Sequence, residues 1–177
     1  MQTPKHRRAE RKRKLLKWSA GLRDIVAPIV TEAPARFNME YWSTDPGDPD
    51  RVEGEHKTLP AVIMPTCFAA GCAAGWATYL FRFSRKLQLR LKGTMIELHR
   101  DGHPSAIRDE EGAVAAFFDI TLPHAEEITL PDRYFQRETY GESITPDQVA
   151  DRIDQILEEI NSTSNYPGYE YHASLCS

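Results

Sequence analysis

The sequence predicts a mainly α-helical fold, a compact helical domain around one central helix of small residues, with a short β-hairpin as a minor α+β element. An uncharged stretch rich in Ala and Gly occupies residues 65–81. Amphipathic patterns with a period near 3.6 residues precede and follow it, and residues 87–91 alternate apolar and polar side chains as a strand does. The length of 177 residues suits one domain, and a 41% hydrophobic composition with 17 Phe, Tyr and Trp residues excludes a disordered chain.

The charge distribution divides the chain into three parts: a basic N-terminal arm at residues 1–17, a single mostly helical domain at 18–161, and a polar, aromatic C-terminal tail at 162–177. The arm has eight basic residues and one acid, a net charge of +7, and the remaining 160 residues carry −11, which gives −4 in total. A basic arm on an acidic body suits a phosphate backbone or an acidic protein surface.

The first helix is expected at about residues 9–26, and Pro28 is expected to end it because proline removes a backbone donor. The predicted apolar stripe consists of Leu15, Leu16, Leu22 and Ile25. Residues 35–42 bring aromatic side chains together, which favours a core plug over an aromatic binding platform. Residues 43–57 are rich in Pro, Gly and Asp and predict a loop.

The central helix is expected at residues 66–83 and is predicted to be buried. The uncharged run at 59–81 is too short to span a membrane as a helix, because Pro60 and Pro65 leave only about 16 helical residues, or roughly 24 Å, where a bilayer core needs about 30 Å. No membrane span is therefore expected. Gly71 and Gly75 remove side-chain bulk from one face, so close approach of another helix is predicted.

Residues 87–91 and 94–99 are predicted to form a β-hairpin with its turn at Lys92-Gly93. A second turn at Asp101-Gly102 adds a third short strand through Ala106. The alternative continues the central helix to Leu91.

Three more helices are expected at residues 108–120, 121–128 and 145–160. The last has the clearest signature, since Thr145 as cap, Pro146 at the first position and Gln148 make a capping box. Its predicted buried stripe is Val149, Ile153, Ile156, Leu157 and Ile160. Residues 161–177 are expected to be loose unless their tyrosines dock.

The cysteines could serve either in catalysis or in packing. Cys67, Cys72 and Cys176 are an odd set without Cys-x-x-Cys spacing, which predicts reduced thiols, a cytoplasmic location and no metal. Arg and Lys fill the first residues where a signal peptide would need an apolar segment. Cys67 or Cys72 would need a histidine base to act as a nucleophile, and buried packing is the favoured interpretation. The candidate bases are His99, His103 and His124, with Asp101 or Asp119 to orient them. No nucleotide or cofactor fingerprint occurs, so no cofactor is expected.

The basic arm and a second basic cluster are the expected binding residues, and the expected partner is nucleic acid or an acidic host or phage protein, in an unknown oligomeric state. The arm contributes Lys5, Arg7, Arg8, Arg11, Lys12, Arg13, Lys14 and Lys17. The second cluster consists of Arg82, Arg85, Lys86, Arg90 and Lys92.

Three short motifs resemble those of a loose group of small uncharacterised proteins from phages and bacteria, over about residues 36–160. The matching positions are Phe37, Asn38, Met39 and Trp42, then Cys72, Ala74, Gly75, Trp76 and Ala77, then Ile144, Thr145 and Gln148. The chain departs from the group at Phe68-Ala69, where the group has Gly-Thr, and Cys67 is one residue out of register. The resemblance implies a phage or mobile-element origin and supplies no activity.

The sequence thus predicts a non-enzymatic accessory protein that binds nucleic acid or a host macromolecule through its two basic segments. One alternative is a cysteine-dependent hydrolase or transferase that uses a helix-borne thiol. The other is a helical structural subunit of a larger assembly.

Overall fold

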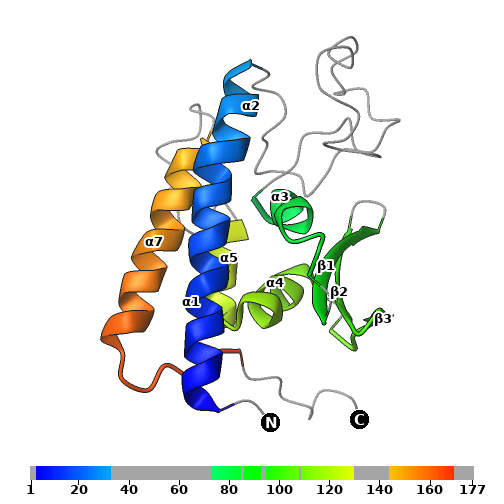
Figure 1. Cartoon of the computed structure of the whole chain (residues 1–177), viewed down its shortest axis with the longest axis vertical. Coiled ribbons are helices and arrows are strands. Elements are labelled where there is room, and N and C mark those ends of the chain that lie inside the picture. The colour runs from blue at the N-terminus through cyan, green and yellow to red at the C-terminus, as the bar shows by residue number, and fades with distance from the viewer. Residues whose placement is uncertain are drawn as a thin grey trace.

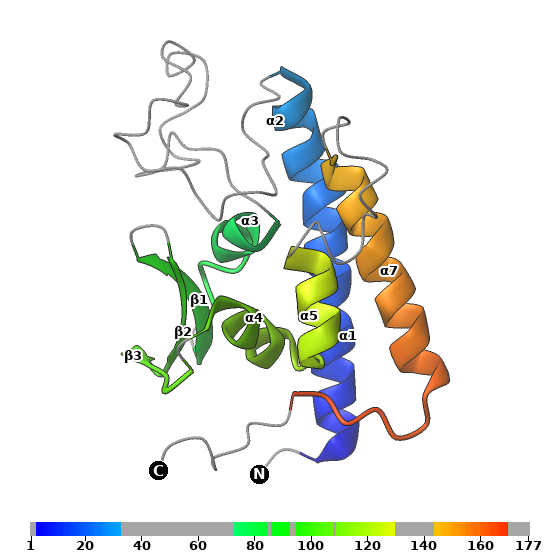
Figure 2. The same cartoon turned by 180° about the vertical axis from the view of Figure 1, so that it is seen from behind.

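The computed structural model describes residues 3–32, 73–84, 86–92, 95–107, 109–129 and 144–169. A long N-terminal helical rod and a C-terminal helix lie side by side, and shorter helices separate this pair from a small sheet (Figures 1 and 2). The mainly helical class with a minor antiparallel sheet is confirmed.

The rod consists of helix α1 (Pro4–Gly21), a π-helical turn η1 (Leu22–Val26) and helix α2 (Ala27–Glu32). Thr3 caps α1, because its hydroxyl accepts a hydrogen bond from the His6 amide at 3.3 Å. The helix therefore begins before the expected residue 9. Residues 4–17, expected as an arm outside the domain, form most of α1.

Pro28 does not end the rod, contrary to the prediction. It is the second residue of α2, directly after the π-helical turn. A proline ring clashes with the carbonyl four residues earlier in a regular α-helix, and the wider π-helical turn relieves this crowding. Of the predicted apolar stripe, Leu15 and Leu22 are buried, whereas Leu16 and Ile25 are exposed, and Val26 is buried as well.

Strands β1 (Leu87–Lys92), β2 (Met95–Arg100) and β3 (His103–Pro104) form an antiparallel sheet in that order. The predicted hairpin and third strand are confirmed, although β3 is shorter than expected, and the alternative of a helix continuing to residue 91 is wrong. Asp101 and Gly102 have φ of 50° and 86°, the left-handed conformation that tight hairpin turns require. Leu89 lies opposite Leu98, and both are buried.

Helices α3 (Ala73–Leu80), α4 (Glu110–Phe118) and α5 (Leu122–Thr129) fill the space between the rod and the sheet. Trp18 of α1 stacks on Phe118 of α4 with ring centroids 4.2 Å apart. Gly21 of α1 meets α3 so closely that a Cβ there would lie 2.6 Å from Leu80 Cδ1. The close helix approach in the described part of the chain thus uses a glycine of the rod.

Helix α7 (Pro146–Ser162) runs antiparallel to α1 (Figure 1) and has the predicted capping box. The Thr145 hydroxyl accepts a hydrogen bond from the Gln148 amide, and the Gln148 side chain accepts one from the Thr145 amide. All five residues of the predicted stripe are buried, so this element is confirmed.

Tyr166 docks the segment that follows α7. Its hydroxyl oxygen accepts a hydrogen bond from the Thr121 amide at 2.8 Å and lies 2.8 Å from His124 Nδ1. The Arg11 guanidinium lies 4.6 Å from the centre of the tyrosine ring. The described part of the tail is therefore attached to both α1 and α5.

Several expectations concern residues outside the described ranges: the aromatic segment 35–42, the loop 43–57, the start of the central helix at Thr66, and the three cysteines. Within the described ranges, none of the helices combines the length and the apolar character that crossing a membrane requires.

Candidate nucleic-acid interface

The basic residues of α1 divide into an inward and an outward group. Arg11 and Lys14 are only 5% and 8% exposed, although both are charged. They share a helix face with Leu15 and Trp18, one turn further along, which are fully buried. The four-residue spacing of Arg11 from Leu15 and of Lys14 from Trp18 is the sequence signal that could have distinguished the inward cations from the outward ones.

The inward cations stabilise the C-terminal end of α4. Arg7 and Arg11 donate to the two carboxylate oxygens of Asp119 at 2.5 and 2.7 Å, and Lys14 Nζ donates to the Phe117 carbonyl at 2.6 Å. Asp119 is the C-cap of α4 in a left-handed conformation with φ of 59°. Cations are favourable there because the last carbonyls of a helix carry partial negative charge.

Burial lowers the pKa of the Lys14 ammonium, and the nearby carboxylate of Glu10 opposes this effect. Burial of the charged Lys14 ammonium therefore lowers the stability of the folded protein. Arg8 is exposed but donates to the Asn161 carbonyl at 3.0 Å, which ties α1 to the end of α7. Arg7, Arg8, Arg11 and Lys14 therefore have structural partners.

The outward group is exposed to solvent. We call it the basic face, and it consists of Lys5, Lys12, Arg13 and Lys17. Glu10 is the one acidic residue in α1, and its carboxylate lies 3.9 Å from the Arg13 guanidinium. The basic face keeps a clear excess of positive charge.

Lys17 connects the basic face to the end of α3. Its Nζ lies 4.8 Å from the centre of the Phe81 ring, and Phe81 is directly followed by Arg82 and Phe83. The Arg82 guanidinium lies 3.9 Å from the centre of the Tyr79 ring and 4.6 Å from that of Phe83. One residue from each predicted basic segment, Lys17 and Arg82, thus contacts an aromatic ring at the end of α3.

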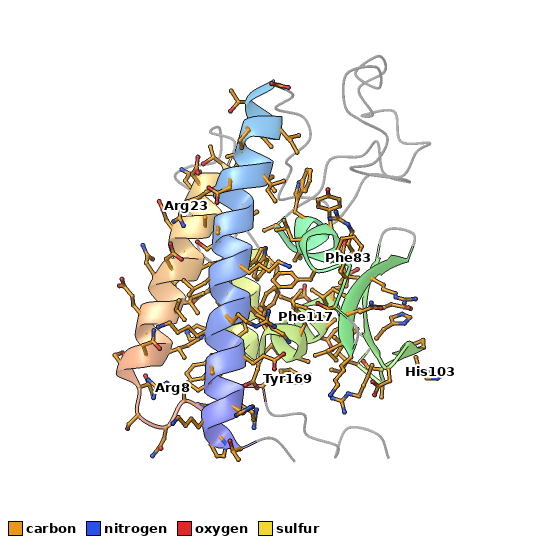
Figure 3. The ribbon with its side chains drawn as sticks, viewed as in Figure 1. Arg8, Arg23, Phe83, His103, Phe117 and Tyr169 are labelled. Carbon is orange, nitrogen blue, oxygen red and sulfur yellow. The ribbon has the colours of Figure 1, made fainter. Side chains whose placement is uncertain are left out.

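The aromatic residues of this turn differ sharply in exposure. Phe81 is 3% exposed and packs against Phe117, whereas Phe83 is 82% exposed. Figure 3 shows Phe83 beside α3 and Phe117 among the packed side chains of the core. We call Tyr79, Arg82 and Phe83 the aromatic corner.

The rest of the second basic cluster lies on the sheet. Lys86 is exposed before β1, and Lys92 ends that strand, while Arg85 lies outside the described residues. Arg90 is exposed, donates to Gln88 Oε1 at 2.8 and 3.0 Å, and has Glu97 as its cross-strand partner. Because side chains alternate along a strand, Arg90 lies on the face opposite the buried Leu89. The structure therefore separates Arg90 from the helix-facing side of the sheet.

The candidate catalytic histidines occupy separate places. His99 in β2 lies 3.2 Å from Glu97 Oε2, while its buried Nδ1 has no hydrogen-bond partner among the described residues, and His103 is exposed in β3 (Figure 3). His124 lies between Tyr166 and Glu159, whose carboxylate is 3.3 Å from His124 Nε2. Asp119, a proposed orienter, accepts from arginines. Cys67 and Cys72 lie outside the described residues.

In the part of the chain that the structure describes, no three side chains of His, Cys, Asp or Glu gather as metal ligands would. No protein-family model, curated protein or solved structure matches the chain.

Proposed function

We propose that the protein is a non-enzymatic, nucleic-acid-binding accessory protein, of phage or mobile-element type and cytoplasmic, that binds phosphate backbones through the basic face of α1. One observation carries the proposal: the four cations of the basic face are all exposed along α1, and Lys17 contacts Phe81 in the turn that also holds Arg82 of the aromatic corner.

The arrangement suits a backbone-reading mode. Lys5 and Lys12 are seven residues apart, so they lie about 10 Å apart along the helix axis and on nearly the same side. Each cation that neutralises a phosphate releases a counterion, which makes binding weaken steeply as salt increases. The net charge of −11 on residues 18–177 opposes binding elsewhere, which confines nucleic acid to this face.

A deletion of residues 1–17 is unsuitable as a test, because it removes the buried Arg11, Lys14 and Leu15 along with the basic face. Substitutions of exposed residues keep the core intact. The test variant carries Lys5→Gln, Lys12→Gln and Arg13→Gln. A control removes two exposed charges from the sheet, with Arg90→Gln and Arg100→Gln.

Binding of labelled 20-nucleotide DNA and RNA strands, and of the DNA duplex, is measured by fluorescence anisotropy at 50 and 200 mM salt. We expect the α1 variant to lose at least tenfold in affinity at 50 mM salt, with the slope of log K against log salt reduced by about 2 to 3. The sheet variant is expected to keep its affinity within about twofold. Equal losses in both variants, or no salt-sensitive binding by the unaltered protein, would overturn the proposal.

A further inference from the structure

We infer that Phe83 is a stacking platform for an unpaired base, which makes single-stranded nucleic acid the ligand of the aromatic corner and the basic face. The inference rests on the proposed function, since the basic face supplies the phosphate contacts. It adds the class of nucleic acid and the residue that selects it.

The exposure of Phe83 is the first observation. The Phe83 side chain is 82% exposed, so most of its apolar surface is in water. Phe81, two residues earlier in the chain, and the core residues Phe117 and Phe118 are buried. Burying such a ring against a partner is favourable because apolar area leaves water. A flat partner can cover the ring without any rearrangement of the core.

The fixed position of Arg82 is the second observation. Its guanidinium lies over the rings of both Tyr79 and Phe83, and it donates to the Tyr79 carbonyl at 2.9 Å. Tyr79 in turn meets Trp76 edge-on, with centroids 6.1 Å apart and planes at 87°. Because Trp76 is buried, the aromatic corner is anchored in the core. An anchored cation beside an exposed ring provides both a phosphate contact and a stacking surface.

The charge around the corner selects the partner. No acidic residue occurs in the sequence between Glu55 and Glu97, while Arg82, Arg85 and Lys86 follow α3 within six residues. Lys17 adds a cation from α1 next to Phe81. An exposed ring in a stretch of the chain that carries cations and no acids complements a ligand that joins flat apolar groups to negative charges, and a nucleic-acid strand has this chemistry.

Stacking on a side chain distinguishes single strands from duplexes. Bases in a duplex are already stacked on their neighbours, whereas an unpaired base has a free face for an aromatic ring. Such stacking tolerates every base, so little sequence preference is expected. DNA and RNA share this chemistry and are separated by the test.

The test measures binding of dT15, of U15 and of a 15-unit abasic DNA strand that keeps the phosphates and lacks the bases. The variants are Phe83→Ala, Phe83→Trp and the control Leu122→Ala, which removes an exposed apolar side chain of α5. We expect Phe83→Ala to weaken binding of dT15 or U15 by about 5- to 100-fold. Phe83→Trp and Leu122→Ala are expected to keep the affinity, and none of the three variants should change binding of the abasic strand. The tighter of dT15 and U15 identifies the sugar.

The outcomes separate this inference from the function on which it rests. If Phe83→Ala binds dT15 and U15 as well as the unaltered protein does, stacking is wrong, and the proposed function stands provided that the Lys5, Lys12 and Arg13 substitutions still weaken binding. If the unaltered protein binds only the DNA duplex, the single-strand inference is wrong and the proposed function stands; if it binds neither the duplex nor any of the three strands, both are wrong, and the corner is then to be tested against an acidic protein. Because Phe83 is exposed, circular dichroism and the urea midpoint should show that Phe83→Ala folds normally.

Discussion

Arg11 and Asp119 are 108 residues apart in the sequence, yet Arg11 Nη2 donates to Asp119 Oδ2 at 2.7 Å. The pair joins the first half of α1 to the C-cap of α4, and Gly168 of the C-terminal segment lies against both side chains. The most basic segment of the chain is therefore partly a structural element. Some of its cations stabilise the fold and others are proposed to bind the ligand, and single substitutions can separate these two roles.

Replacing Asp119 with Ala is expected to lower the free energy of unfolding by about 2 to 4 kcal/mol. The change leaves the buried Arg11 without its carboxylate and places a residue with a Cβ, and no polar side chain, in the left-handed conformation at φ 59°. Urea unfolding measures the loss. Asp119→Asn is the matched control, because Asn tolerates this conformation and keeps one acceptor, so it should lose less. Equal losses would show that the remaining acceptor and the conformational tolerance of Asn contribute nothing, and that the whole effect comes from the lost charge.

Neighbouring residues Arg11 and Lys12 are expected to respond in opposite ways to the same substitution. Arg11→Gln should cost about 2 kcal/mol or more, because Arg11 is buried against Asp119 and Tyr166, whereas Lys12→Gln should stay within about 0.5 kcal/mol. The effects on affinity for a 20-nucleotide strand are the opposite. Lys12→Gln should bind the strand more weakly, whereas the folded Arg11→Gln protein should bind it with unchanged affinity. Urea unfolding and anisotropy on the two proteins test this. A loss of binding in Arg11→Gln that matches Lys12→Gln would contradict the division into two groups.

Lys14 predicts a pH dependence of stability. Burial lowers its pKa below 10.5 in the folded protein, so the unfolded chain binds this proton more tightly. Between the folded pKa and 10.5 the unfolded state holds more protons, and stability therefore rises with pH in that window. The free energy of unfolding of the unaltered protein minus that of Lys14→Met should increase as pH rises from 7 toward 10.5. Urea unfolding at pH 7, 9 and 10 measures this difference, and a constant or falling difference would show that burial of the charge is not costly.

Tyr166 is expected to hold the segment after α7 through its hydroxyl. Tyr166→Phe removes the acceptor for the Thr121 amide and the partner of His124 Nδ1, which should cost about 1 to 2 kcal/mol. Hydrogen exchange at the Thr121 amide should become faster. The Val149 amide, bonded to the Thr145 carbonyl at the start of α7, is the internal control. An unchanged Thr121 rate would mean that the hydroxyl does not hold this segment.

Local patterns in the sequence were sufficient to predict several elements. The capping box of α7 depends on residues three apart, and the turn between β2 and β3 depends on Asp101 and Gly102 alone. The continuation of the rod past Pro28 depends on the π-helical turn before it, which no residue pattern marked. The inward position of Arg11 depends on Asp119, which is distant in sequence.

The aromatic corner shows the same limit at the candidate site. Phe81 and Phe83 are both phenylalanines, two residues apart in the same apolar and basic stretch, so the sequence does not distinguish them. Helix α3 ends at Leu80, so the following turn directs Phe81 to the core and Phe83 to solvent. The place where the helix ends depends on how it packs against β1 and α1, which composition does not reveal.

Gly21 offers a test of the packing of α1 against α3. The effect of Gly21→Ala on the free energy of unfolding should have opposite signs in the unaltered protein and in a Leu80→Ala variant. Gly21 has ordinary helical angles, with φ of −62° and ψ of −36°, so Ala there should stabilise the helix by about 1 kcal/mol on propensity alone. The added Cβ would lie 2.6 and 2.8 Å from Leu80 Cδ1 and Cδ2, and Leu80 is buried, so Gly21→Ala should instead lower the free energy of unfolding by about 1 to 2 kcal/mol. In a Leu80→Ala background the clash is gone, and the same change should then be stabilising. Urea unfolding of the four proteins gives the coupling energy, and a destabilisation of equal size in both backgrounds would show that Leu80 is not the residue that requires glycine at this position.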